Sequence, residues 1–142
     1  MLLEIPKIRL KIIDSSNFIN GPLSDFPKTF VLTELKKGYF PHLFNTQENE
    51  NYVGPILDKK YYCYNQMKPE ARRKFLEWYL QRVQENYIFD MKKELLEYCG
   101  SDLDILRNGC LKFREAFLDI ANIDLFQYLT IASVRMAIYG YL

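Results

Sequence analysis

Tyr98 and Asp102 are the residues whose types and spacing best suit chemistry, because they lie four positions apart. At about 3.6 residues per turn, a helix places such positions on one face, so a phenol and a carboxylate are directed at the same spot. Metal-dependent phosphodiester hydrolysis needs oxygen ligands for two cations and a group that orients the attacking water. The pair suits one half of such a site, although the spacing alone is more often that of ordinary charged residues on a helix surface.

Other reactive side chains are few. The three cysteines, Cys63, Cys99 and Cys110, form no C-x-x-C pair, and with the single His42 they cannot build the usual Cys/His zinc site. They are typical of reduced thiols in an intracellular protein, and they leave the compartment, the nucleus included, open. His42 lies in a bulky apolar stretch, which favours a packed or surface histidine over a catalytic one.

Length and composition describe an ordinary globular chain. Its 142 residues are 49% hydrophobic and 26% charged, which fits one compact domain or a slice of a larger one. The net charge of +1 creates no field over the whole molecule that would attract nucleic acid or membrane, so any nucleic-acid contact must be local. The apolar runs are shorter than the ~20 residues of a membrane helix, and no targeting segment is visible.

The N-terminal third carries strand and turn signals. Apolar Ile8, Leu10 and Ile12 alternate with basic residues and stop at Asp14, which predicts a half-buried strand. Over residues 18–30 glycine and prolines allow only a helical turn or two. A short extended piece is expected over residues 30–35. The helical turn is predicted to carry inward Leu23, Phe26 and Phe30.

Residues 36–67 show no helical period but are rich in tyrosine and phenylalanine. Long irregular segments are uncommon in compact domains and are often functional. Two interpretations stay open: a binding loop, or an aromatic loop packed onto the core.

Helix signals dominate residues 68–142. One helix is expected from Pro69 to about Glu85, and another from an Asp90 cap to about Ile120. Asp124 is expected to cap a final apolar helix. For the basic residues of the first of these helices a solvated face is the default and contact with phosphate is the alternative. These basic residues are Arg72, Arg73, Lys74 and Arg82.

Two stretches together carry a family resemblance. FPKTFVLTELKKGYFPHLFN over residues 26–45, with EYCGSDLDIL over residues 97–106, closely resembles protein-primed family B DNA polymerases, nearest those of linear plasmids and self-synthesising transposons. The likeness runs from the strand before Asp14 to about Ala137. It implies the C-terminal half of a 3′–5′ exonuclease domain. The expected fold class is α/β: a partial ribonuclease H-like domain, with one or two N-terminal strands followed by mostly helices. The domain is expected to divide into a strand-rich part (1–35), the aromatic segment (36–67) and a helical part (68–142).

The resemblance also implies roles for four residues. Asp102 is similar to the metal-binding carboxylate of the third exonuclease motif, and Tyr98 to its water-orienting tyrosine. Lys36 resembles a lysine that helps to position the primer terminus. Ser15 resembles the serine of a single-strand DNA-binding motif, in which the family has leucine where this chain has Ser16.

By resemblance, the chain belongs to an enzyme, a DNA-directed DNA polymerase with Mg²⁺-dependent 3′–5′ exonuclease. Its expected partners are the single-stranded 3′ end of the primer, the rest of the polymerase and a priming terminal protein, with no membrane. The other metal-binding carboxylates and the polymerase motifs are not among these residues, so we expect the isolated chain to be inactive. The alternatives are a polymerase-derived, non-enzymatic helical module that binds protein or DNA, or a non-functional relic.

Overall fold

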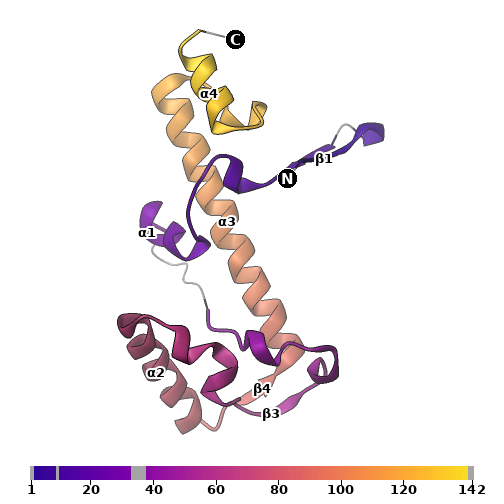
Figure 1. Ribbon diagram of the computed structural model, residues 1–142, viewed down its shortest axis with the longest axis vertical. Helices are drawn as coiled ribbons and strands as arrows, with labels where there is room; N and C mark the ends of the chain where they lie inside the picture. Colours follow the sequence, from indigo (N-terminus) through magenta and orange to yellow (C-terminus); the bar gives the residue numbers. More distant parts are fainter. Residues whose placement is uncertain (1, 9, 33–37, 141–142) are drawn as a thin grey trace. The chain divides into compact units, whose positions relative to one another are not determined.

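The protein is mixed α/β and mostly helical, and the computed structural model describes residues 2–8, 10–32 and 38–140 (Figure 1). The chain divides into two compact units: the first comprises Met1–Lys36 and Asp104–Leu142, and the second comprises Lys37–Leu103. In the described ranges the strands form two antiparallel sheets of two strands each. No helix in those ranges is long and apolar enough to cross a membrane. The expectation of an α/β chain that is mostly helical is confirmed.

The sheet of the first unit is a hairpin. Strands β1 (Leu2–Ile5) and β2 (Leu10–Ile13) are joined by a 3-10 turn at Pro6–Ile8. The predicted strand over residues 7–12 was therefore wrong in its start, and Ile8 lies in the turn with 66% of its surface exposed. Ile12 is also 44% exposed. Alternation predicts which side chains share a face of a strand, but it does not predict whether anything covers that face. The register pairs Leu2↔Ile13, Leu3↔Ile12, Glu4↔Lys11 and Ile5↔Leu10.

The core of the first unit forms around α3 (Met91–Ala121), of which the residues from Asp104 onward belong to this unit. Three side chains far apart in the sequence are buried together, namely Phe18, Leu125 and Val134. Phe113 and Phe117, one turn apart on α3, pack against them. Phe113 and Phe117 thus present an apolar face of this part of α3 to the core of the unit.

The short helix α1 (Phe26–Thr29) also belongs to the first unit. Of the residues predicted to point inward, Phe26 is buried, whereas Leu23 and Phe30 are half-buried. Val31 has a left-handed backbone with φ of 54°, and residues 30–31 form a turn where an extended piece was expected. Residues 33–35 of that expected piece lie outside the described residues.

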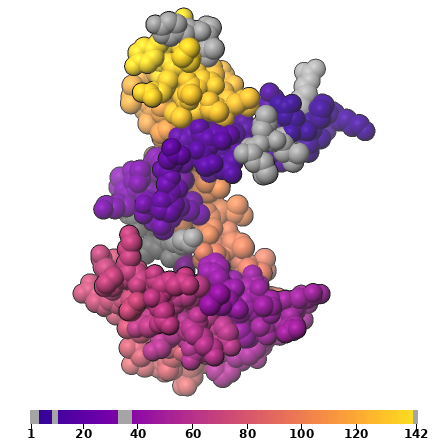
Figure 2. All heavy atoms as spheres, in the orientation of Figure 1, coloured from indigo at the N-terminus to yellow at the C-terminus, as the bar shows by residue number. Residues whose placement is uncertain are grey.

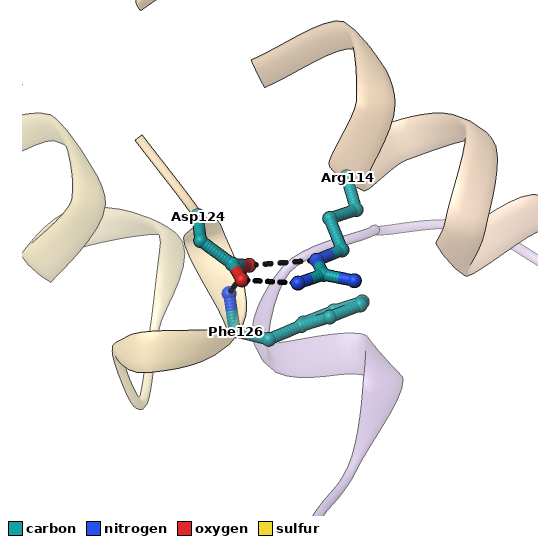
Figure 3. A network of polar contacts seen from close by, with 3 residues as sticks. All are labelled: Arg114, Asp124 and Phe126. Atoms are coloured by element: carbon teal, nitrogen blue, oxygen red, sulfur yellow. Dashed lines mark hydrogen bonds and ion pairs between the residues drawn. The ribbon is translucent and has the colours of Figure 1, made fainter. Parts of the chain in front are cut away.

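The C-terminal region differs from its prediction. Asp124 caps a 3-10 helix, Leu125–Gln127, by accepting a hydrogen bond from the N–H of Phe126. Arg114 on α3 grips the same carboxylate through Nε and Nη2, as Figure 3 shows, and this pairing lowers the pKa of Asp124. The helix α4 (Ile131–Ile138) begins later, with Thr130 as its cap. Two capped segments, separated by residues 128–130, replace the single helix that was expected.

In the second unit the helices follow the sequence closely. α2 spans Pro69–Gln84, and α3 begins at Met91 after Asp90 accepts a hydrogen bond from the N–H of Lys93. Both predictions are confirmed to within a residue. Two short strands, β3 (Val53–Pro55) and β4 (Ile88–Asp90), form the second antiparallel sheet and were not predicted.

The aromatic segment packs against α2 and α3 to make the core of the second unit. Figure 2 shows its atoms and those of α2 as one closely packed body, in magenta and rose. Phe75 on α2 is fully buried, and the rings of Tyr39, Tyr62 and Tyr79 surround it with centroids 5.1, 5.3 and 5.7 Å away. Packing, one of the two alternatives for this segment, therefore accounts for these rings. The buried members of this core are Phe40, Leu57, Tyr62, Phe75, Phe89 and Met91.

Candidate functional site

Tyr98 lies on the part of α3 that belongs to the second unit, and other aromatic rings hold it in place. Phe40 stacks on it, with 5.1 Å between ring centroids and 28° between ring planes. The imidazole of His42 meets the same ring edge-on at 5.4 Å. A Cβ atom at Gly38 would lie 3.9 Å from Cδ2 of Tyr98. Residues 38–42 therefore fix the direction of this phenol, and exposed His42 is a surface histidine packed on rings, as predicted.

Asp102 follows Tyr98 by four positions on the continuous helix α3, so the two side chains share a face. Both are half-buried, and the Oδ1 atom of Asp102 is shielded from solvent. The rings around Tyr98 belong to Phe40 and His42, so this phenol is not submerged in an aliphatic core. The structure thus gives the pair the geometry that the spacing predicted, while its chemical role stays a prediction.

A cavity of about 150 Å³ opens beside Tyr98, and we name it the Tyr98 cavity. One wall comes from α3 and the other from the C-terminal half of α2 and the start of the aromatic segment. A recess of this size admits a small part of a larger ligand next to the phenol. Its lining residues are Gly38, Tyr39, Trp78, Arg82, Glu94, Glu97, Tyr98 and Ser101.

Three charged side chains line the Tyr98 cavity. Glu94 accepts a hydrogen bond from the Tyr87 hydroxyl, which together with burial raises the pKa of Tyr87 to about 12. Glu97 pairs with Lys93, with 3.9 Å between Oε1 and Nζ. The Arg82 guanidinium carbon lies 4.2 Å from the centroid of the Tyr87 ring. Each carboxylate thus has a polar partner, whereas the cation is held by a ring face.

The contributions of Trp78 and Arg82 were missed at the level of sequence. From the sequence, a solvated face is the default for Arg82 and phosphate contact the alternative, and nothing distinguishes Trp78. Helical spacing relates residues on one helix only, so it cannot indicate which face of α2 meets α3. The signal available was that Trp78 and Arg82 lie four positions apart on one helix face.

The other predicted residues lie elsewhere. Ser15 is half-buried in the first unit, at the start of a 3-10 helix whose Asp14 cap accepts a hydrogen bond from the N–H of Ser16. This bond lowers the pKa of Asp14. Ser15 lines a cavity of about 330 Å³ together with Lys11 and Phe126. Lys36 lies outside the described residues.

Metal-ligating side chains are sparse in the part of the chain that the structure describes. There, no group of three or more His, Cys, Asp or Glu side chains is placed to hold a metal ion. Cys63, Cys99 and Cys110 are free thiols. Burial raises the pKa of the Cys110 thiol.

Residues 1–141 match the model of a family described as DNA polymerase type B, organellar and viral. The chain therefore belongs to the type B DNA polymerases. Among its relatives, a "Probable DNA polymerase" of Neurospora intermedia is 30% identical over 135 residues, which are 94% of this chain and 14% of that protein. Proteins of the same description from Agaricus bitorquis and Podospora anserina are 27% and 29% identical, each over 92% of this chain.

The chain spans only 10–17% of the length of these three relatives, so it corresponds to one segment of a polymerase of this family. No solved structure matches it significantly.

Proposed function

We propose that this chain forms part of the 3′–5′ exonuclease domain of a protein-primed type B DNA polymerase and supplies its third exonuclease motif. In this proposal Tyr98 orients the attacking water and Asp102 is one ligand of the catalytic cations. The observation that carries it is the pairing of a half-buried phenol and a half-buried carboxylate on one face of α3. The adjoining Tyr98 cavity and the chain's membership of the family support it.

The proposal extends to the domain and to two further residues. The segment 1–142 belongs to a ribonuclease H-like exonuclease domain, made of a strand-rich part (1–35), the aromatic segment (36–67) and a helical part (68–142). Lys36 helps to position the primer terminus, and Ser15 contacts single-stranded DNA. The capped turn at Asp14 supports the role of Ser15, because it fixes the backbone that presents the hydroxyl. A priming terminal protein is the further partner.

Mg²⁺ is the cofactor of the proposed reaction. An ion of this kind takes six ligands, mostly oxygen atoms, in an octahedron. Asp102 supplies one carboxylate, and no group of three ligating side chains is found among the described residues. These residues do not hold the ion by themselves, so Asp102 is assigned a share of a site that other parts of the polymerase complete. Accordingly, we expect the 142-residue chain alone to remove no nucleotides.

The test places the chain in a longer polymerase. The matching segment of the Neurospora intermedia relative is exchanged for this chain, and removal of an unpaired 3′ nucleotide is measured alongside templated synthesis. We expect Asp102→Ala and Tyr98→Phe to slow excision by about a hundredfold or more and to leave synthesis unchanged.

Asp104→Asn is the matched control, because Asp104 is an exposed carboxylate on the same helix, and its excision rate should stay that of the parent. Undiminished excision by Asp102→Ala, in a chimera that excises, would refute the assignment.

A further inference from the structure

Arg82 borders two cavities of the second unit. One is the Tyr98 cavity, and the other is a larger recess of about 440 Å³ between the end of α2 and the sheet of β3 and β4, which we name the Ile88 cavity. Its volume lies within the range of about 300–1,000 Å³ that is usual for ligand sites. Arg82 therefore borders both the cavity beside Tyr98 and a ligand-sized recess.

The guanidinium of Arg82 is held by rings and not by carboxylates. It lies 4.2 Å from the ring centroid of Tyr87 and 6.0 Å from that of Trp78. Among the residues that the structure describes, Arg82 forms no ion pair. The two acidic side chains of the Tyr98 cavity have other partners: Glu94 the Tyr87 hydroxyl, and Glu97 the ammonium of Lys93. A planar cation fixed in this way keeps its donors available for a bidentate oxyanion such as phosphate.

The walls of the Ile88 cavity suit a flat, mostly apolar group. Tyr79 and Tyr87 contribute aromatic rings, and Val83 and Ile88, which are 44% and 62% exposed, contribute aliphatic surface. Asn86 adds an amide, with donors and an acceptor, from a left-handed backbone at φ of 49°. Stacking on aromatic rings and contact with Arg are the usual means by which proteins bind unpaired bases.

We propose that Arg82 and the Ile88 cavity form a subsite for one nucleotide of single-stranded DNA, with the base in the cavity and a phosphate on Arg82. The inference rests on the proposed function, since it takes DNA as the substrate, and it adds a positioning residue on α2. A protein segment in the same recess would require no cation at its edge, so the guanidinium favours a nucleotide.

The test uses the 142-residue chain and a fluorescent oligothymidylate of about twelve nucleotides, titrated at several salt concentrations. Trp78 is the single tryptophan of the chain and its ring centroid lies 6.0 Å from the Arg82 guanidinium, so its emission reports on phosphate contact at that cation. We expect Arg82→Gln to weaken binding about tenfold and to lower the slope of log affinity against log salt by about 0.7, the value for one phosphate of a single strand. Arg82→Lys keeps the charge but not the planar guanidinium, so its affinity should lie between those of the parent chain and Arg82→Gln.

Arg73→Gln is the matched control, because it removes the same charge from an exposed position on the same helix and lies outside both cavities. It should bind like the parent chain. An oligomer of abasic sugar phosphates should bind more weakly than oligothymidylate, because it has no base to occupy the Ile88 cavity. Circular dichroism melting shows whether the Arg82 variants are folded. If Arg82→Gln is unfolded, the affinity of Arg82→Lys is compared with that of the parent chain instead.

Three outcomes overturn the proposal: no binding of oligothymidylate by the parent chain at low salt, equal losses for the Arg82 and Arg73 variants, or equal binding of the abasic oligomer. Equal losses for the Arg82 and Arg73 variants would mean that the strand binds elsewhere. Equal binding of the abasic oligomer would mean that the contact involves phosphate alone. None of them touches the excision assay of the chimera, so failure of this subsite and failure of the proposed function remain distinguishable.

Discussion

Replacing Gly109 by alanine is the sharpest test of how α3 packs in the first unit. Gly109 is buried, and a Cβ atom built on it would lie 2.5 Å from Cδ2 of Phe26 and 3.2 Å from Cδ2 of Phe30. Carbon atoms in favourable contact are about 3.5–4.0 Å apart, so the Phe26 ring must move. That ring is 4% exposed and meets Phe30 edge-on with centroids 5.3 Å apart, which leaves it little room.

Two effects of opposite sign set the size of the change. Alanine is favoured over glycine inside a helix by about 1 kcal/mol. Forcing a methyl group into a packed core costs about 1–3 kcal/mol. We therefore expect Gly109→Ala to lower the free energy of unfolding by up to about 2 kcal/mol. Gly100 is the control on the same helix, because a Cβ there meets nothing within 4 Å, so Gly100→Ala should raise stability by about 1 kcal/mol.

Urea unfolding followed by circular dichroism measures both variants. Because the two substitutions are chemically identical, the difference between them isolates the packing contribution, about 1–3 kcal/mol. Trimming the ring with Phe26→Leu should recover part of the loss in the Gly109→Ala background, as expected for residues in contact. If Gly109→Ala proves as stable as Gly100→Ala, the close approach of α1 to α3 is wrong.

Further predictions concern caps and titrating groups. The ion pair with Arg114 lowers the pKa of Asp124, so its stabilising effect is present above pH 4 and lost on acidification; unfolding midpoints between about pH 5 and 3 should fall less steeply for Arg114→Gln than for the parent. Thr130→Ala removes the cap of α4 and should cost about 1 kcal/mol, measured by urea unfolding, with no loss contradicting the capping geometry. The bond to Glu94 raises the pKa of Tyr87 to about 12, so stability from this pair is present below pH 10 and lost as pH rises towards 12; Glu94→Gln should lower that pKa, seen in phenolate absorbance as an earlier onset of ionisation.

The sequence predicts the helices of this protein well, because their signals are local. The stretch from Pro69 to Gln84 begins with a proline in its first turn, and that from Met91 to Ala121 follows the capping residue Asp90. Both have apolar positions every three or four residues, and both helices are found as expected. Asp124 shows the limit of such reasoning, since a good cap predicts that a helix begins but not how long it runs. Here the helical segment ends after one 3-10 turn, and the next helix begins at Ile131.

Features that depend on distant partners could not be predicted. Strands β3 and β4 have three residues each. Val53 pairs with Asp90, which lies beyond α2 in the sequence, so no local signal predicts the pairing. The shared face of Tyr98 and Asp102 follows from spacing on one helix. The cavity beside them does not, because Arg82 reaches it from another helix.

The packing of Phe40 and His42 against the ring of Tyr98 has an energetic consequence for any ligand that contacts this phenol. Immobilising a side chain on binding costs roughly 0.5–1.5 kcal/mol in lost rotamer freedom. Here folding has already removed that freedom, since the ring is stacked at 5.1 Å on a side chain that is itself buried. A ligand therefore meets a phenol oxygen whose position is preset, and little of the binding free energy is spent on ordering the ring.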